Sequence, residues 1–396
     1  MERLTMIDYA KKSLTGVWVG DCIGNLGQLY FVHDILRALE SGMIKFGGQL
    51  NRFNQQFVYS DDTEEAIVLY NHLKNSGTRN FPVIDQNTLA MEFATRYMDR
   101  DPDGEIYGYG LNTRKVLRDI YEGVPWKDAN KIIKKSEGMP SHIDSLVDSL
   151  SKGKGFKDAM TGVNTALQQQ RQEQLGKEKV GSCGNGSAIR VAPLGAYLAS
   201  FAEMTAERLI VEAALQAQVT HCHPEGIAGS IAITSLAYTV TQMEQDSSYL
   251  LSLYKKWEGC STAEVLFNET LANVPLGQVR DGVLKAKDLP LETPIGKAIE
   301  VLGNGTHVTC QDTVPLCCWL AIKALTRYQV PDMYEKSIIE TSMAFGDVDT
   351  NCAIVGGIIG IVSPPPEKWS KFCNPMEGVD EQDYKLRFRL AEMTTS

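Results

Sequence analysis

The sequence has little that is typical of membrane-spanning or secreted proteins. Its longest apolar run, residues 352–362, is far shorter than the roughly 20 residues that a transmembrane helix needs. Residues 1–14 alternate charged and apolar side chains and lack the apolar core of a signal peptide. The nine cysteines are an odd number and include no Cys-x-x-Cys pair, which is more typical of a reducing compartment than of a disulfide framework. We therefore expect a cytoplasmic protein without a membrane segment.

The sequence also lacks any excess of positive charge. With 39 Lys and Arg against 49 Asp and Glu, its formal net charge is -10, so we expect no binding to nucleic acid or to anionic membranes. A small anionic ligand can still bind through local donors or a metal ion. The 396 residues are 43% hydrophobic and 22% charged, which is enough apolar material for a sizeable core. Composition gives no indication of the oligomeric state.

Alternating strand patterns are hard to find, and helical periodicity dominates instead. Apolar residues recur at the three-to-four spacing of one buried helix face across 188–198, 209–217 and 227–236. This pattern favours an all-α fold. We predict a single domain over residues 1–370 and a C-terminal tail at 371–396.

One stretch inside the predicted domain has a different composition. Residues 134–179 are polar, with a glutamine-rich run and few apolar anchors. One interpretation is a solvated helix pair or a loop. The other is an inserted element near the mouth of a site, where it selects the carrier of a substrate or controls access.

Two acidic clusters each stand directly before an apolar helical run. They are residues 59–65 (Tyr-Ser-Asp-Asp-Thr-Glu-Glu) and residues 345–351 (Phe-Gly-Asp-Val-Asp-Thr-Asn). Acidic and hydroxyl side chains also cap helix N-termini, and capping explains either cluster alone. If the clusters face one another, they offer four carboxylates and hydroxyl oxygens, which suit Mg²⁺ or Mn²⁺ rather than zinc. So many carboxylates stay ionised together only beside cations, and two bridged metal ions satisfy that requirement.

Two further patterns contain glycine or histidine. Residues 181–187 form a glycine-rich turn before a predicted helix, where backbone N–H groups can hold a phosphate, although half of such turns are merely turns. A comparable turn lies at 303–306. His221-x-His223 before Pro224 is a poor zinc site; a contact with a base or ribose and plain capping of the next helix fit it equally well.

Residues 16–25 combine small side chains at a spacing of four with an acid, Asp21. The spacing is typical of a close contact between helices. A carboxylate buried in such a contact is costly without a partner, so we expect Asp21 to have either a partner in the protein or a water molecule in a site.

The order of these motifs resembles the ADP-ribosylglycohydrolase family, to which the dinitrogenase-reductase-activating glycohydrolase belongs. The motifs are Gly-Asp-x-x-Gly, Ser-Asp-Asp-Thr, Tyr-Gly, Gly-Asn-Gly-x-Ala-x-Arg-x-x-Pro-Leu-Gly, His-x-His-Pro and Gly-Asp-x-Asp-Thr-Asn. They run from about Gly16 to Gly360, and the most specific pieces are residues 182–195 and 346–357. The resemblance implies an all-α orthogonal bundle that hydrolyses the N- or O-glycosidic bond between ADP-ribose and its carrier.

The resemblance also implies a binuclear Mg²⁺ centre beside a substrate cleft. The implied metal ligands are Ser60, Asp61, Asp62, Asp347, Asp349 and Thr350. The predicted substrate-binding residues are Asp21, Gly110, Gly184, Asn185, Gly186, Ser187 and His221. Asp62 and Asp347 are the predicted catalytic residues, because they would orient the attacking water as well as bind metal. Cleavage at the anomeric carbon passes through an oxocarbenium-like state that carboxylates stabilise, and a metal-activated water supplies the nucleophile.

The chain departs from the family pattern at several positions. Gln28 stands where many members carry a glutamate, and a neutral amide cannot serve as a base. If that glutamate is needed, activity is slow or Glu64 or Glu65 substitutes for it. Phe345 and Val348 replace a glycine and a threonine of the last motif, which changes the packing around its carboxylates. The polar stretch has no counterpart in the family, so the resemblance does not predict the carrier.

Three functions are consistent with the sequence, and we favour the first. It is a hydrolase that releases ADP-ribose from an ADP-ribosylated protein or a small conjugate. The second is a non-catalytic ADP-ribose-binding protein, for example one that antagonises an ADP-ribosylating toxin. The third is another metal-dependent nucleoside or phosphate hydrolase. Only the first produces free ADP-ribose in a Mg²⁺-dependent reaction.

Overall fold

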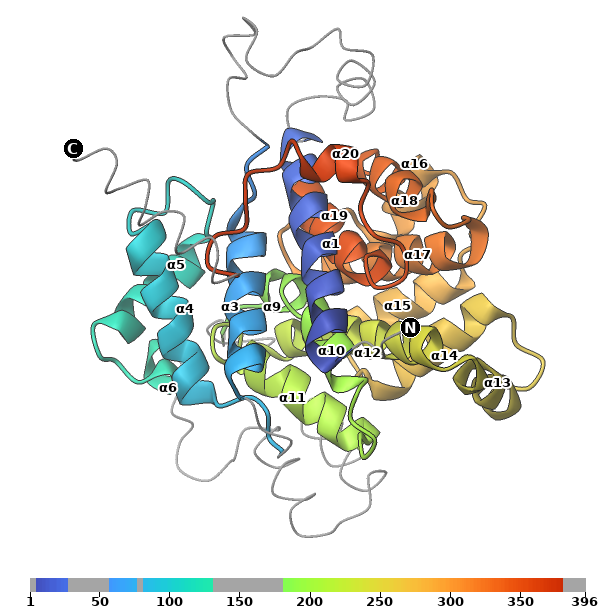
Figure 1. The fold of residues 1–396 in the computed structure, drawn as a ribbon, viewed down its shortest axis with the longest axis horizontal. Coiled ribbons are helices and arrows are strands. Elements are labelled where there is room, and N and C mark those ends of the chain that lie inside the picture. The colour runs from blue at the N-terminus through green and yellow to red at the C-terminus, as the bar shows by residue number, and fades with distance from the viewer. Residues whose placement is uncertain (1–4, 28–56, 77–80, 131–180, 380–396) are drawn as a thin grey trace, which may run out of the picture.

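The regular structure of the chain is helical wherever the computed structural model describes it (Figure 1). The described residues are 5–27, 57–76, 81–130 and 181–379. The β-type pairing among them is limited to two isolated bridges, Phe57 with Cys373 and Gly184 with Thr309. The predicted all-α fold is therefore confirmed.

The helices occupy three regions of Figure 1. On one side lie α4 (Gln86–Arg100), α5 (Leu111–Tyr121) and α6 (Trp126–Ala129). In the middle lie α1 (Met6–Gly27), α3 (Asp61–Ser76), α9 (Gly186–Ile189), α10 (Ala192–Leu198), α11 (Ala206–Gln218), α12 (Pro224–Gln245) and α19 (Val348–Ile359). On the other side lie α13 (Ser247–Lys256), α14 (Thr262–Asn273), α15 (Gln278–Asp288), α16 (Ile295–Leu302), α17 (Cys310–Arg327) and α18 (Met333–Ser342), and α20 (Glu367–Ser370) lies above α19 in this view.

Helices α1 and α19 form the most extensive helix pair among the described elements, and glycines bring their backbones together. A Cβ atom added at Gly16 would lie 2.1 Å from the carbonyl oxygen of Gly356, and one added at Gly20 would lie 2.2 Å from that of Cys352. At Gly24, one turn further along α1, an added Cβ would lie 2.6 Å from the Cα of Asp349. The small residues spaced by four in α1 therefore make the close helix contact that the sequence predicts.

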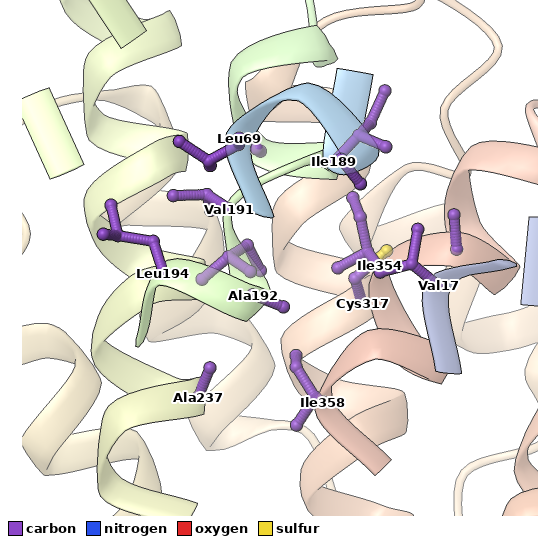
Figure 2. Close-up of a cluster of buried hydrophobic side chains, with 14 of the residues drawn as sticks. Val17, Leu69, Ile189, Val191, Ala192, Leu194, Ala237, Cys317, Ile354 and Ile358 are labelled. Carbon is purple, nitrogen blue, oxygen red and sulfur yellow. The ribbon is translucent and has the colours of Figure 1, made fainter. Parts of the chain in front are cut away.

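The core between these helices is apolar and closely packed (Figure 2). Val17 of α1, Leu69 of α3, Leu194 of α10, and Ile354 and Ile358 of α19 are all fully buried. Burial of one such side chain contributes about 1.5–3 kcal/mol to folding. This core packs together α1, α3 and α19, the three helices that carry the acidic motifs.

Residues 371–379, which lie beyond the predicted domain boundary, pack against the start of the chain. Asn374 donates its backbone N–H to the Phe57 carbonyl (2.8 Å), and its side-chain oxygen accepts from the backbone N of Tyr59 (3.1 Å). Its own carbonyl accepts from the indole Nε1 of Trp18 (2.8 Å). This segment therefore holds the residues that lead into the first acidic cluster.

The polar stretch at 134–179, Gln28 and residues 380–396 lie outside the described residues. Among the described helices, none is both long and apolar enough to span a bilayer. All nine cysteines lie in the described ranges, and each is a free thiol.

Candidate active site

The first acidic cluster starts α3, and a carboxylate from α1 holds its backbone. Asp21 is fully buried, and its oxygens accept from the backbone N of Ser60 (2.9 and 3.1 Å) and of Thr63 (3.1 Å). The Thr63 hydroxyl donates another hydrogen bond to Asp21 over 2.6 Å. Asp21 thus caps α3 from a different helix, because the first N–H groups of a helix have no partner within it. The buried acid has the partner in the protein that the sequence requires.

Asp61 and Asp62 follow directly in the first turn of α3. The hydroxyl of Ser60 accepts from the backbone N of Asp62 (3.2 Å), so Ser60 also caps this helix. The backbone N of Asp61 donates to the carbonyl of Tyr107 (2.7 Å), which fixes the neighbouring loop against the cluster. Capping and ligand binding are therefore compatible here, because the caps leave Asp62 Oδ2 without a hydrogen bond.

The second acidic cluster starts α19. Asp347 is the N-cap residue, and its carboxylate accepts from the side-chain amide of Asn185 (2.7 Å) and from the side chain of Thr350. Gly346 before it has φ = +73°, and a Cβ there would lie 2.4 Å from the Asn304 carbonyl oxygen. This position needs glycine both for the left-handed backbone and for the close approach. The amide of Asn185 connects the second cluster to the glycine-rich turn.

The two clusters converge across the contact between α1 and α19. One carboxylate oxygen from each of Asp21, Asp62 and Asp349 lies within 4.8 Å of the others. Asp62 Oδ2 and Asp349 Oδ1 are buried and have no hydrogen-bond partner. Buried polar atoms in folded proteins are nearly always paired, so two unpaired carboxylate oxygens in one acidic group require an explanation.

The electrostatics of this group are unfavourable without a cation. Burial raises the pKa of Asp61 and of Asp62 well above the ordinary value. Burial and the charge of Asp349 raise the pKa of Asp21 and of Asp347 to about 7. Neighbouring carboxylates cannot all ionise unless positive charge neutralises them. A donor set of carboxylate and hydroxyl oxygens fits Mg²⁺ or Mn²⁺.

The two glutamates of the first cluster form ion pairs with arginines. Glu64 is buried between Arg96 and Arg100 of α4, with Arg100 Nε 2.9 Å from its Oε1. Glu65 accepts from Nη1 of the fully buried Arg190 over 3.0 Å. Each glutamate is therefore neutralised by an arginine, so the idea that one of them replaces the missing family glutamate is not supported by these contacts.

The glycine-rich turn at 184–187 is fastened to the loop before α17. Cys310 N donates to the carbonyl of Cys183 (3.0 Å), and Asn185 N donates to that of Val308 (3.3 Å). These bonds place the turn beside the second acidic cluster, as the Asn185 amide also does. The turn leads into α9, a helix of one turn.

His221 lies against the glycines of this turn. A Cβ added at Gly186 would lie 2.8 Å from Cε1 of His221, and one at Gly184 would lie 3.1 Å from its Nε2. The other ring nitrogen, Nδ1, shares a hydrogen bond with the Thr220 hydroxyl (2.7 Å). Burial and the charge of Arg190 lower the pKa of His221 to about 3, so the ring is neutral at physiological pH.

The second histidine of the motif has a different task. His223 is the N-cap of α12: its Nδ1 accepts from the backbone N of Glu225 (3.1 Å), and Pro224 occupies the first helical position. The two interpretations of the motif thus divide between its histidines, with capping at His223 and proximity to the glycine-rich turn at His221.

A family model described as ADP-ribosylglycohydrolase matches residues 2–373. The chain belongs to the ADP-ribosylglycohydrolase family. The resemblance that the order of the motifs indicates is therefore confirmed.

The individual proteins that this chain resembles share little sequence identity with it. An uncharacterized protein of Archaeoglobus fulgidus is 27% identical over 214 residues, which are 53% of this chain and 60% of that protein. The chain thus matches less than two thirds of the length of that relative. A solved structure titled ADP-ribosylglycohydrolase-related protein complex aligns over 93% of both chains, with 16% identity and a TM-score of 0.49.

Most of the predicted site residues of this family member lie close together in the structure. For Gly110 and Ser187 the contacts do not point to a ligand. Gly110 is the N-cap of α5, and nothing lies within 4 Å of a Cβ added there, whereas one added at Gly108 would lie 3.6 Å from Asp61 Oδ1. The hydroxyl of Ser187 donates to the Gly226 carbonyl (2.8 Å), so it serves the fold of the turn. Their ligand roles stay predictions.

Sequence reasoning missed two features of the site. It assigned Asp21 to substrate binding, and it did not foresee that this residue caps α3 and lies with Asp62 and Asp349. It also gave no role to Arg190, although this residue is the arginine of the Gly-Asn-Gly-x-Ala-x-Arg motif. An arginine within an otherwise apolar helical run was the available signal, because such a charge is rarely buried without a partner.

Proposed function

We propose that this family member is a Mg²⁺-dependent hydrolase that cleaves the glycosidic bond between ADP-ribose and its carrier and releases ADP-ribose. The observation that carries the proposal is the pair of buried, unpaired oxygens, Asp62 Oδ2 and Asp349 Oδ1. They lie within an acidic group that folding assembles at a cost, and a divalent cation would remove that cost. Family membership supplies the substrate class.

The proposed centre takes two ions and uses both clusters. Its ligands are Ser60, Asp61, Asp62, Asp347, Asp349 and Thr350, with Asp21 beside them. When bound, Mg²⁺ or Mn²⁺ would neutralise these carboxylates and act as a Lewis acid toward oxygen atoms of the substrate.

The protein's own residues would perform the remaining steps. Asp62 and Asp347 would orient the attacking water, and the surrounding carboxylates would stabilise positive charge that develops at the anomeric carbon. The glycine-rich turn at 184–187 would hold the diphosphate or the neighbouring ribose through its backbone N–H groups. The neutral ring of His221, which lies against this turn, would contact the same part of the ligand without adding charge.

The second candidate is an ADP-ribose-binding protein without turnover. Glu64 and Glu65 are both paired with arginine, and Gln28 is neutral. The glutamate that many family members carry therefore has no free replacement in the first cluster. On this alternative the acidic group still binds a cation and the ligand, but no product forms.

The test is release of free ADP-ribose from arginine-, serine- and asparagine-linked ADP-ribosyl proteins, with Mg²⁺ and with EDTA. We expect release in Mg²⁺, loss of release in EDTA, and loss in Asp62→Asn. Asp288→Asn, at an exposed position of α15, is the matched control and should behave as wild type. No release from any linkage, together with Mg²⁺-dependent ADP-ribose binding, would establish the binding protein instead.

A further inference from the structure

Arg190 is fully buried, and its guanidinium contacts three residues from different parts of the chain. Its Nη1 donates to Glu65 Oε2 of α3 (3.0 Å), and its Nε donates to the side-chain oxygen of Gln216 of α11 (2.7 Å). Its Nη2 donates to the Gln216 carbonyl (2.8 Å), and the group stacks over the ring of Phe93, 4.3 Å from the ring centre. Arg190 therefore fixes Glu65 relative to α11.

Gln216 extends this chain of contacts to the glycine-rich turn. Its side-chain Nε2 donates to the carbonyl oxygen of Ser187 (2.9 Å) and to the hydroxyl of Ser230 (2.6 Å). The turn also lies directly against Glu65, because a Cβ added at Gly186 would lie 3.5 Å from Glu65 Oε2. A closed set of buried contacts thus connects Glu65 with the turn.

Glu65 lies in the same helical turn as the proposed metal ligands. It follows Asp61 by four residues and Asp62 by three, the spacings that place side chains on one helix face. Its charge is also the largest electrostatic influence on Asp61 after burial itself, and it raises the Asp61 pKa. A change in the position of Asp61 or Asp62 therefore acts directly on Glu65.

Stability alone does not account for this arrangement. Removing two charges from water costs several kcal/mol per ion, and a buried ion pair often stabilises a fold no more than an apolar pair of the same volume. Such networks do impose one geometry on the elements that they join. Here the joined elements are the acidic turn and the glycine-rich turn.

We infer that Glu65, Arg190 and Gln216 form a positioning relay that couples the acidic first turn of α3 to the glycine-rich turn at 184–187. Cation binding at the acidic turn would then order the turn that takes the diphosphate. The inference rests on the proposed function for the identity of the two ligands. The contacts themselves do not depend on it.

Hydrogen exchange of the backbone amides at 184–187, with and without Mg²⁺, tests the relay without any substrate. We expect Mg²⁺ to slow exchange at these amides by about tenfold or more in wild type, and to have little effect there in Arg190→Lys and Gln216→Glu. The single nitrogen of lysine cannot reach both Glu65 and Gln216 as the separate Nη1 and Nε atoms of Arg190 do. A carboxylate at 216 keeps the bond to Arg190 but repels the Ser187 carbonyl. Thermal unfolding shows whether each variant is folded.

Arg96→Lys is the matched control, because it alters another arginine–glutamate pair of the same helical turn that does not lead to the glycine-rich turn. It should retain the Mg²⁺-dependent protection. In a parallel titration, Mg²⁺ should tighten ADP-ribose binding by a factor that falls about tenfold in the relay variants, while the affinity for Mg²⁺ alone is nearly unchanged.

Each outcome decides the matter. Undiminished protection in both relay variants, equal loss in Arg96→Lys, or no Mg²⁺-dependent change in wild type would overturn the relay. Protection that depends on Arg190 and Gln216 in a protein that releases no ADP-ribose would support the relay and reject the proposed hydrolase.

Discussion

Four acidic side chains fall within five positions at the start of α3, and their partners decide which of them are free to bind a cation. Glu64 and Glu65 face arginines from α4 and from the segment between α9 and α10, whereas Asp62 keeps a buried oxygen without any partner. All four side chains are carboxylic acids. What differs is the neighbour supplied from elsewhere in the chain.

At this scale the clearest prediction concerns Asp62→Asn. Without metal, burial disfavours the ionised form of Asp62 and so raises its pKa. The neutral amide should therefore increase the free energy of unfolding by roughly 1–3 kcal/mol in EDTA. With Mg²⁺ wild type should become the more stable of the two proteins. Its free energy of unfolding should rise by about 2.7 kcal/mol when the ion is at one hundred times its dissociation constant, whereas that of the variant should change little. Urea unfolding in EDTA and in Mg²⁺ measures both. An Asp62→Asn protein that gains as much stability from Mg²⁺ as wild type would remove Asp62 from the centre.

The sequence could predict which acids gather, but not which of their oxygens are free. Hydroxyl and acidic residues before an apolar helix indicate a capped N-terminus, and two such motifs indicate a cation site. Arg190, which pairs with Glu65, lies 125 positions after it in the sequence. Asp21, whose carboxylate caps α3, lies 39 positions before Ser60. Pairings at such separations depend on how the helices pack, which local patterns do not encode.

At the scale of elements, the glycines of α1 both allow the close contact with α19 and determine where the acidic side chains lie. Glycines at positions 16, 20 and 24 let the helices approach until their backbones touch, and the same approach brings Asp21 to Asp349. The spacing of four predicted the contact. It did not predict that α19 is the partner, because any helix with a matching surface would fit the same stripe.

Gly24→Ala should therefore disturb both the fold and the acidic group. Its Cβ would lie 2.6 Å from the Asp349 Cα and 2.7 Å from the Val348 carbonyl oxygen, so the first turn of α19 must move. We expect a loss of about 1–3 kcal/mol in the free energy of unfolding and a weaker affinity for Mg²⁺. Gly296→Ala, where nothing lies within 4 Å, is the matched control and should be neutral or stabilising. Equal Mg²⁺ affinities in the two variants would show that the approach of the helices does not set the centre.

Helix α11 offers a prediction on pH that is independent of the metal site. Glu212 is buried, accepts from the backbone N of Val83 (2.7 Å) and of Ile84 (3.0 Å), and burial raises its pKa from 4.5 to about 7. The folded protein therefore binds this proton more tightly than the unfolded chain. The stabilisation is complete below pH 4.5 and is lost as the pH rises to about 7, by roughly 1.4 kcal/mol per pKa unit.

Glu212→Gln removes this titration. The unfolding free energy of wild type minus that of the variant should therefore decrease between pH 4.5 and 7 and then level off. Urea unfolding of both proteins across this range measures the difference. Parallel pH profiles would mean that Glu212 does not titrate in this interval.

At the scale of the whole molecule, the last described segment of the chain packs beside the candidate site. The segment 371–379 bonds to α1 through Trp18 and to the residues before α3 through Tyr59. The sequence-based prediction placed this segment in a C-terminal tail. Cys373 and Val379 are buried in the core, and Asn374 makes the hydrogen bonds to Trp18 and Tyr59. Contacts between segments so far apart in sequence depend on how the chain packs, so local patterns do not indicate that residues beyond the predicted boundary support the first acidic cluster.

Asn374→Ala tests whether this segment supports the site or merely follows the domain. The change removes the acceptor of the Tyr59 backbone N–H, and an unpaired N–H of this kind costs about 1–3 kcal/mol. Because Tyr59 directly precedes Ser60, we also expect weaker Mg²⁺ binding, measured by titration alongside urea unfolding. Asn71→Ala is the control: its amide bonds to the Gly378 carbonyl of the same segment at an exposed position, so its loss should change stability by less than about 0.5 kcal/mol. If both variants matched wild type in stability and in Mg²⁺ affinity, residues 371–379 would have no structural role in the site, and the predicted domain boundary near 370 would stand.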